Sequence, residues 1–243
     1  MGKHNRTLGF FNHIFFCALM VGLVTLSTTQ ATAAESAEEQ ELVDKAVLTL
    51  KHFLYHPDMS FFPEYLKKSV GVLIVPTFIK AGLVLGGAGG QGVLLARDEK
   101  TGEWSEPAFY TLGSGSLGLQ IGVEVSEVIL IIKTRKVIDS LYASSLKLGG
   151  DVSVAAGPAG RGAGAKGLNA DTISFALSKG VFAGISVEGA VITPRETAND
   201  AYYGAPVTPL EIIMFHKVAN PQSAQLRETL TDAYNSAKSS EKE

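Results

Sequence analysis

Cysteine is almost absent from this chain of 243 residues, because Cys17 is the only one. It lies in an apolar stretch near the start, so the rest of the chain has no thiol and cannot build a disulfide framework. Phe16 stands directly before Cys17, and such a bulky residue does not suit a lipoprotein cleavage site, which argues against lipidation. The fold must therefore be held together by its own packed core.

An excess of basic charge is also missing. The formal net charge is −3, from 21 basic and 24 acidic residues. Residues 1–33 carry two of the basic residues and no acidic one, so without them the balance is 19 against 24, or −5. This balance argues against nucleic acid as the main partner. Contact with an anionic membrane would need a local basic patch.

Residues for catalysis or metal binding are sparse. The glycine-rich middle of the chain contains no histidine, and Ser114 and Ser116 do not stand in a G-x-S-x-G elbow. His52 and His56 are one helical turn apart, a spacing that can bind a metal, but two surface histidines at a helix end are the simpler interpretation. We therefore expect no enzyme, no metal and no cofactor.

Two stretches, 87–92 and 113–118, match the dinucleotide pattern G-x-G-x-x-G. That pattern works when the glycine turn leads into a helix whose amino end holds the pyrophosphate. Both stretches here lead into strand-like sequence instead, GVLLARD and LGLQIGVEV. The sequence therefore disfavours nucleotide binding.

The first 33 residues have the pattern of a secretory signal peptide. A charged start is followed by an apolar core over residues 10–26, and Ala31-Thr32-Ala33 supplies small residues for cleavage between Ala33 and Ala34. A retained membrane anchor is the alternative, although the apolar core is short for a span of about 20 residues. We expect a periplasmic or secreted protein, with association with a membrane left open.

Glycine is what the chain has in abundance: 22 of its 26 glycines lie between Gly71 and Ile192, within long apolar stretches. Strand-forming residues dominate these stretches, and so many glycines predict a sheet that bends sharply or is approached closely by a backbone or a ligand. Candidate strands are 70–76, 82–86, 91–97, 106–112, 116–125, 127–133, 147–156, 172–178, 181–187 and 189–193. Residues 157–167 read as a loop.

Helices are predicted at both ends of this block. Apolar residues recur at helical spacing from residue 43, after a possible capping box of Ser36 and Glu39, and the helix should end before Pro57. Further helical segments are expected at 59–69, 134–144, 199–204 and from Asn220-Pro221 onward, whereas 210–215 could be a strand or a short helix. The sequence therefore predicts an α+β fold. A strongly curved antiparallel sheet, closed like a barrel or a sandwich, carries helices from both chain ends packed on it. We assign 34–236 to a single domain and 237–243 to a solvated tail.

Two sets of residues are candidates for contact with a membrane. If strand ends gather on one side, basic residues there would form a rim for lipid headgroups, and ordinary solvated charge is the alternative. These residues are Lys67, Lys68, Lys80, Arg97, Lys133, Arg135 and Lys136. The apolar stripe of the leading helix either packs on its own domain or inserts into lipid. Its members are Val43, Val47, Leu50, Phe53 and Leu54.

The block resembles the SYLF domain family, in several motifs that occur in the expected order. They are FFPEYLKKSVGVLIVP, KAGLVLGGAGGQGVLLAR, GEWSEPAFY, SGSLGLQIGVE, LGGDVSVAAGPAGR, SKGVFAGISVEGAVI and NDAYYG, which together run from about Ala46 to about Met214. The resemblance implies binding of membrane lipids, phosphoinositides in eukaryotic members, and actin in some fungal members. With the signal peptide, it points to the secreted bacterial branch.

The sequence thus predicts a non-catalytic lipid-binding protein of the bacterial cell envelope. The alternative is a structural or interaction protein of the envelope, which binds a protein partner or associates with itself through exposed strand edges.

Overall fold

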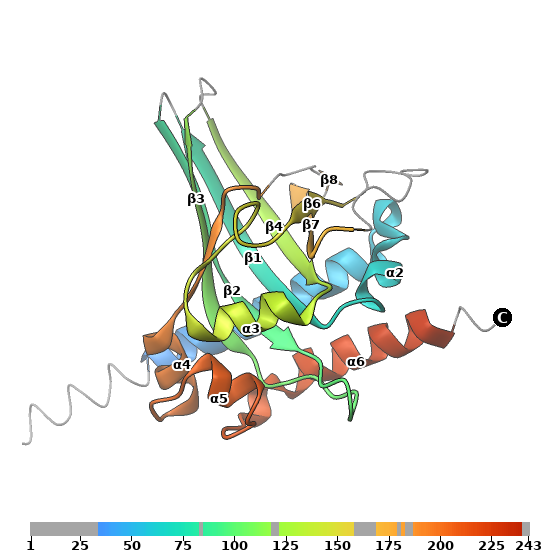
Figure 1. The fold of residues 1–243 in the computed structure, drawn as a ribbon, viewed down its shortest axis with the longest axis vertical. Helices are drawn as coiled ribbons and strands as arrows, with labels where there is room; N and C mark the ends of the chain where they lie inside the picture. Colours follow the sequence, from blue (N-terminus) through green and yellow to red (C-terminus); the bar gives the residue numbers. More distant parts are fainter. Residues whose placement is uncertain are drawn as a thin grey trace, which may run out of the picture.

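The computed structural model describes residues 34–82, 85–117, 122–157, 169–178, 181–182 and 187–239. The predicted signal peptide 1–33 and most of the predicted loop 157–167 lie outside these residues. The architecture is α+β, as expected: one strongly curved sheet carries helices from both ends of the chain (Figure 1). The chain enters through a helix at 34–55 and leaves through α6 (Ala224–Ser239).

Four long strands form the centre of the sheet. They are β1 (Gly71–Gly82), β2 (Leu85–Ala96), β3 (Ala108–Leu117) and β4 (Gly122–Ile132), in the spatial order β3-β2-β1-β4. The sequence had suggested six shorter strands here. The expected strands 82–86 and 116–125 each cover the end of one long strand and the start of the next, because glycines that look like strand breaks lie inside regular pairing.

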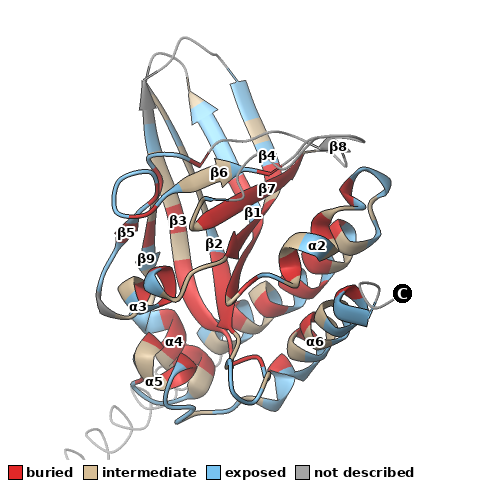
Figure 2. Cartoon of the chain, turned by 45° about the vertical axis from the view of Figure 1, so that its right-hand side comes forward, coloured by how far each residue is buried: buried red, intermediate tan, exposed pale blue. Residues whose placement is uncertain are grey.

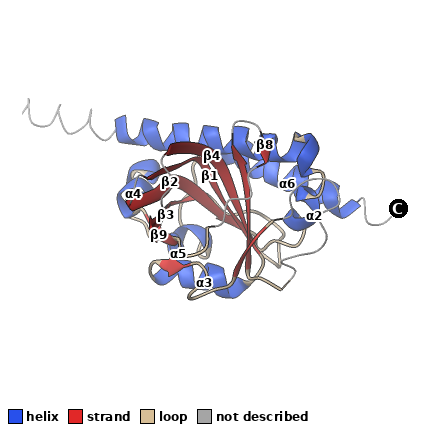
Figure 3. Cartoon of the chain, turned by 90° about the horizontal axis from the view of Figure 1, so that it is seen from above, coloured by secondary structure: helices blue, strands red, loops and turns tan. Residues whose placement is uncertain are grey.

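Short strands extend the sheet on both sides, in the order β5-β9-β3-β2-β1-β4-β7-β6, with β8 paired to β7. Their bounds are β5 (Leu146–Lys147), β6 (Val154–Ala156), β7 (Thr172–Ser178), β8 (Val181–Phe182) and β9 (Val191–Pro194). All described pairings are antiparallel except β6 with β7, which is parallel. The sheet curls into a half-barrel when seen from above (Figure 3).

A sharp bend in β1 explains part of the glycine content. The β1–β2 register shifts between Ile74 and Ile79, which marks a bulge. A Cβ added to Gly90 would lie 2.2 Å from the Thr77 carbonyl oxygen, and one added to Gly92 would lie 2.4 Å from that of Ile74. Only glycine fits at these two positions, so the predicted close approach of another backbone is confirmed here.

Each face of the sheet has its own apolar core. On the face that we call inner, Leu73, Tyr110 and Leu130 pack beneath α3 (Arg135–Ala143) and α5 (Pro209–Ile213). On the outer face, Ile74 and Ile129 pack beneath helix 34–55, η1 (Pro57–Met59), α2 (Phe62–Leu66) and α6. Figure 3 shows helix 34–55 and α6 on one side of the sheet and α3 and α5 on the other.

The C-terminal part follows the expected helix signals. The helix expected at 199–204 is α4 (Glu196–Tyr203), and Gly204 ends it with a φ of 67°. The uncertain segment 210–215 is mostly helical in α5, where Thr208 and Glu211 form a capping box. A 3₁₀ turn, η2 (Pro221–Ser223), leads into α6. No helix among the described residues is both long and apolar enough to cross a bilayer.

Candidate functional site

The apolar stripe of helix 34–55 is buried. Val43, Val47, Leu50 and Phe53 are at most 3 % exposed and belong to the outer-face core, and Leu54 packs against it. The helix is therefore docked on its own sheet. Insertion of these five residues into lipid would require the helix to leave the sheet.

Two polar contacts fasten this helix at its ends. Near its start, Arg195 donates two hydrogen bonds to Glu39, at 2.9 and 3.0 Å. Burial raises the pKa of Glu39, although the Arg195 guanidinium opposes that rise. Near the end of the helix, the Thr49 hydroxyl donates to Glu127 of β4 at 2.9 Å, and a ring nitrogen of His52 lies 3.0 Å from the same carboxylate.

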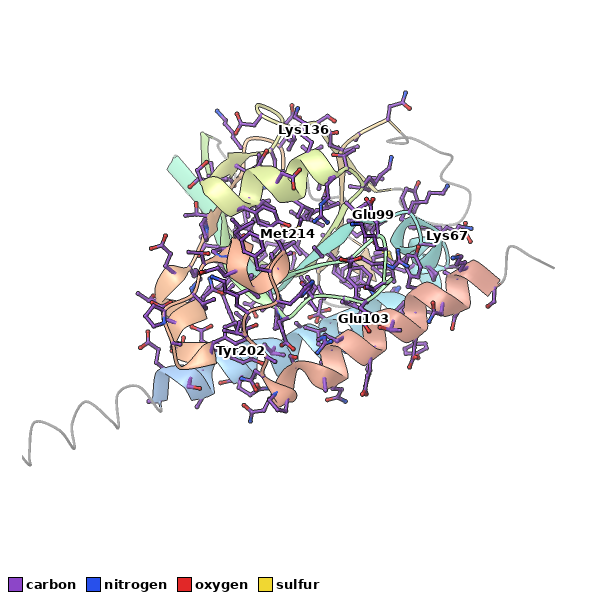
Figure 4. The ribbon with its side chains drawn as sticks, turned by 60° about the horizontal axis from the view of Figure 1, so that its bottom comes forward. Lys67, Glu99, Glu103, Lys136, Tyr202 and Met214 are labelled. Atoms are coloured by element: carbon purple, nitrogen blue, oxygen red, sulfur yellow. The ribbon has the colours of Figure 1, made fainter. Side chains whose placement is uncertain are left out.

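The structure divides the predicted basic rim between the two ends of the sheet. Six of its residues flank the strand ends at Gly71, Ala96 and Ile132, which we call the base of the sheet. Lys80 lies near the opposite end, the tip, in register with Ala88 and Glu124. Figure 4 shows Lys136 at α3 and Lys67 at α2, well apart, with Glu99 between them.

Most of the basal residues are engaged in separate local contacts. Lys67 pairs with Glu64 at 2.6 Å, Arg135 lies 3.7 Å from Asp139, and Lys136 donates to the Asp151 carbonyl at 3.3 Å. The Arg97 guanidinium lies 4.1 Å from the centre of the Tyr234 ring. Lys68 is exposed and Lys133 half-buried. These contacts tie several of the basal cations to neighbouring helices and loops.

The histidine pair also has local roles. His52 contacts Glu127, while His56 accepts a hydrogen bond from the backbone of Asp58 at the start of η1. Within the residues that the structure describes, no three histidine, cysteine or acidic side chains gather as they would around a metal ion.

A surface that the sequence had not singled out lies at the tip of the sheet. On its outer side the register aligns two rows across four strands. We call these eight residues the distal face: Gly113, Gly89, Ile79 and Val125 in one row, and Gly115, Gly87, Ala81 and Val123 in the other. Side chains alternate along a strand, so Val125 shares its side with Glu127, which helix 34–55 contacts. The distal face is thus a continuation of the outer face, beyond the described helix that packs on it.

Large apolar side chains are exposed there. Val123 is 74 % exposed, Val125 49 % and Ile79 45 %. Figure 2 shows that the tip ends of β1–β4 rise above the buried part of the sheet. Seven large apolar side chains are exposed in the described part of the chain, and these three lie together on one face.

A groove continues the distal face toward the end of helix 34–55. Its volume is about 580 Å³, and it includes Tyr55, which is 81 % exposed. The other lining residues are Lys51, His52, His56, Pro57, Pro76, Val125, Ser126, Glu127 and Leu177. The apolar face and the groove meet at Val125 and together form the candidate surface.

The distal face was missed because the strand boundaries were misplaced. Its pattern is nevertheless readable: G-x-G at 87–89 and at 113–115, with V-x-V at 123–125. Those alternations place two glycines, or two valines, on the same side of each strand. Correct pairing of the strands would have brought them together.

Comparison with known proteins gives the family. Residues 113–233 match the family described as "Ysc84: Las17-binding protein actin regulator". The chain is 37 % identical over 157 residues to "LAS seventeen-binding protein 3" of Saccharomyces cerevisiae, covering 62 % of this chain and 34 % of that protein. It is 35 % identical over 192 residues to "Protein YSC84" of the same yeast, covering 74 % and 40 %.

An animal protein is similar as well. "SH3 domain-containing YSC84-like protein 1" of Xenopus laevis is 31 % identical over 182 residues, which cover 73 % of this chain and 54 % of that protein. The chain spans between a third and about half of the length of these relatives, all of which are eukaryotic. The matched region contains the motifs from Ser114 onward, and the yeast relative covers more of the chain: the chain contains a domain of the Ysc84/SYLF family.

Proposed function

We propose that this protein is a non-catalytic module that binds a protein partner on the distal face and the adjoining groove. The observation that carries this proposal is the gathering of three exposed apolar side chains, Ile79, Val123 and Val125, on one side of the described sheet. Exposed apolar patches of this kind mark interaction sites in soluble proteins. The protruding tip makes the patch accessible without any rearrangement of the body.

The names of the relatives support a protein partner. The family description and one yeast relative name Las17 as what is bound, and the family description adds regulation of actin. Las17 and filamentous actin are therefore the first proteins to test. Binding of either, lost on a charge substitution in the distal face, would support the proposal, and the design of that measurement closes the Discussion.

Membrane lipid is the second candidate ligand. The specific observation in its favour is that no charged residue belongs to the distal face, so this face could enter an apolar phase at low cost. Insertion there would need no undocking of the helix. Co-sedimentation with neutral and anionic vesicles at low and high salt tests it: binding that is insensitive to salt fits apolar insertion, and no binding excludes this candidate.

We further propose that residues 1–33 are removed during export and that the protein works in the bacterial cell envelope. The sequence pattern of those residues supports export, and the resemblance to the secreted bacterial branch of the family supports the envelope. The mass of the protein from an envelope fraction tests it, since cleavage between Ala33 and Ala34 predicts an N-terminal Ala34. An intact N-terminus would contradict it.

A further inference from the structure

Four glycines of the distal face are not required by the fold. Gly87 and Gly115 are paired across β2 and β3, and so are Gly89 and Gly113. A Cβ at Gly87, Gly89 or Gly113 would meet only a carbonyl oxygen at 3.5–3.9 Å, an ordinary contact, and one at Gly115 would meet nothing within 4 Å. We call this two-by-two set the glycine tile.

The tile contrasts with Gly90 and Gly92 of the same strand. There a side chain is excluded by the β1 backbone, as described above. At the tile there is room for side chains, and glycine weakens a strand. Glycine inside a strand often marks a place where a ligand or another backbone approaches closely, and no described residue crowds these four positions.

The shape of the surroundings limits what can lie there. The tile is flat and measures roughly 5 by 7 Å between Cα positions, from the spacing of strands and of alternate residues. Ile79 and Ala81 border it on β1, followed by Val125 and Val123 on β4. An aromatic ring laid flat on peptide planes, with aliphatic groups against the neighbouring ridge, fills such a surface, as aromatic residues do when they cover glycines within sheets.

The charges around the distal face further limit which partner can bind. The eight residues of the distal face are uncharged, so a charged side chain buried there would lose its hydration without a counter-ion. Lys51 also lines the groove, and no ion pair is found for it among the described residues. The nearby Glu127 is already satisfied by Thr49 and His52. Among the described residues that line the groove, Lys51 is thus the one charged side chain without a hydrogen bond or ion pair, and an acidic group of a ligand could pair with it.

Building on the proposed function, we infer that the distal face binds a partner segment that carries an aromatic residue, which stacks on the glycine tile. Uncharged aliphatic residues of the segment follow over Ile79 and Val125. An acidic residue then reaches Lys51 at the groove. The partner class is therefore an aromatic and acidic peptide segment.

The test uses a phage-displayed library of random dodecapeptides, selected on the purified protein and depleted on its Val123→Asp variant. We expect the recovered peptides to contain an aromatic residue and an Asp or Glu. Affinity for a recovered peptide should fall about tenfold or more in Gly89→Val or Gly115→Val, which fill the tile. Lys51→Gln should lower it roughly two- to fivefold at low salt and remove the salt dependence.

The matched control is Ser114→Val, which adds the same side chain on β3 but on the other side of the sheet. It should bind as the unchanged protein does. If a valine variant fails to fold, Gly115→Ala replaces it, because its Cβ enters open space. Recovery of no peptides, enrichment of basic residues, or equal binding by the tile variants and Ser114→Val would overturn the inference. Binding of such peptides without binding of Las17 would support the role of the glycine tile and exclude Las17 as the partner.

Discussion

Thr49 donates a hydrogen bond of 2.9 Å to Glu127, and this contact fastens helix 34–55 to β4 immediately below the distal face. The same carboxylate lies 3.0 Å from a ring nitrogen of His52. A single side chain on the sheet thus holds the end of the helix that borders the groove. Its position keeps the helix docked and leaves Val125, two residues earlier on the same side, uncovered.

Loss of this carboxylate should loosen the helix. We expect Glu127→Ala to lower the free energy of unfolding by about 1–2 kcal/mol, because Thr49 loses its acceptor in a partly buried place. Glu124→Ala, on the same strand but the other side of the sheet, is the control and should change stability little. Urea denaturation measures both, and equal midpoints for the two variants would contradict the role of Glu127.

The buried ion pair at the other end of the helix should contribute more to the free energy of unfolding than the contact of Glu127 does. Glu39 is 2 % exposed and Arg195 20 %, and two hydrogen bonds join them. Removing one partner leaves the other charge poorly solvated, so we expect Glu39→Ala to cost about 3 kcal/mol. The exposed neighbour Glu38 provides the control variant Glu38→Ala. A loss below about 0.5 kcal/mol for Glu39→Ala would show that the pair does not hold the helix.

Alanine substitutions at the glycines of β2 and β3 should fall into two classes by their effect on stability. Gly90→Ala must displace the Thr77 carbonyl and should destabilise the fold by about 1–3 kcal/mol. Gly115→Ala meets no atom and should be neutral or stabilising by up to about 1 kcal/mol, since it restricts the unfolded chain. Thermal unfolding compares them directly. Comparable destabilisation by both variants would mean that Gly115, like Gly90, is required by the fold.

Acid stability should depend on Asp171, which joins β7 to the segment before β6. Its carboxylate accepts hydrogen bonds from the Ser153 hydroxyl at 2.7 Å, the Ser153 backbone at 3.0 Å and Thr134 at 3.1 Å. These bonds lower the pKa of Asp171, those from Ser153 most. The group therefore binds its proton more readily in the unfolded chain. Its stabilisation is present above the unfolded pKa, about 3.9, and is lost as pH falls through the lower native pKa.

Asp171→Asn should therefore lower the melting temperature at neutral pH and flatten its fall below about pH 4. Asp139→Asn, at an exposed carboxyl of α3, is the control and should leave the fall of the melting temperature in acid unchanged. A fall of the melting temperature in acid that is as steep in Asp171→Asn as in the unchanged protein would contradict this role of Asp171.

Much of the fold could be predicted from local patterns. The helix before Pro57, the helix ended by Gly204 and the terminal helix after Asn220 all carry local start or stop signals, and the structure has each of them. The curvature of the sheet was correctly expected from its glycines. These signals work because they depend on a few neighbouring residues.

The candidate surface could not be predicted, because it depends on strand register. Gly89 and Gly113 are 24 positions apart, and only pairing brings them together. One member of the basic rim was misplaced for a related reason: Lys80 was expected after a short strand, but β1 continues to Gly82 and carries Lys80 to the tip. Partners such as Tyr234 for Arg97 come from elements far along the chain.

The most direct test of the account is the affinity of the purified protein for Las17 of Saccharomyces cerevisiae, measured by biolayer interferometry with two charge variants. Val123→Asp places a carboxylate on the distal face, whereas Phe215→Asp does so at another apolar side chain, 58 % exposed, after α5. The account predicts saturable binding that Val123→Asp weakens about tenfold or more and Phe215→Asp leaves intact. Equal affinity of Val123→Asp and the unchanged protein, or no saturable binding at all, would contradict it.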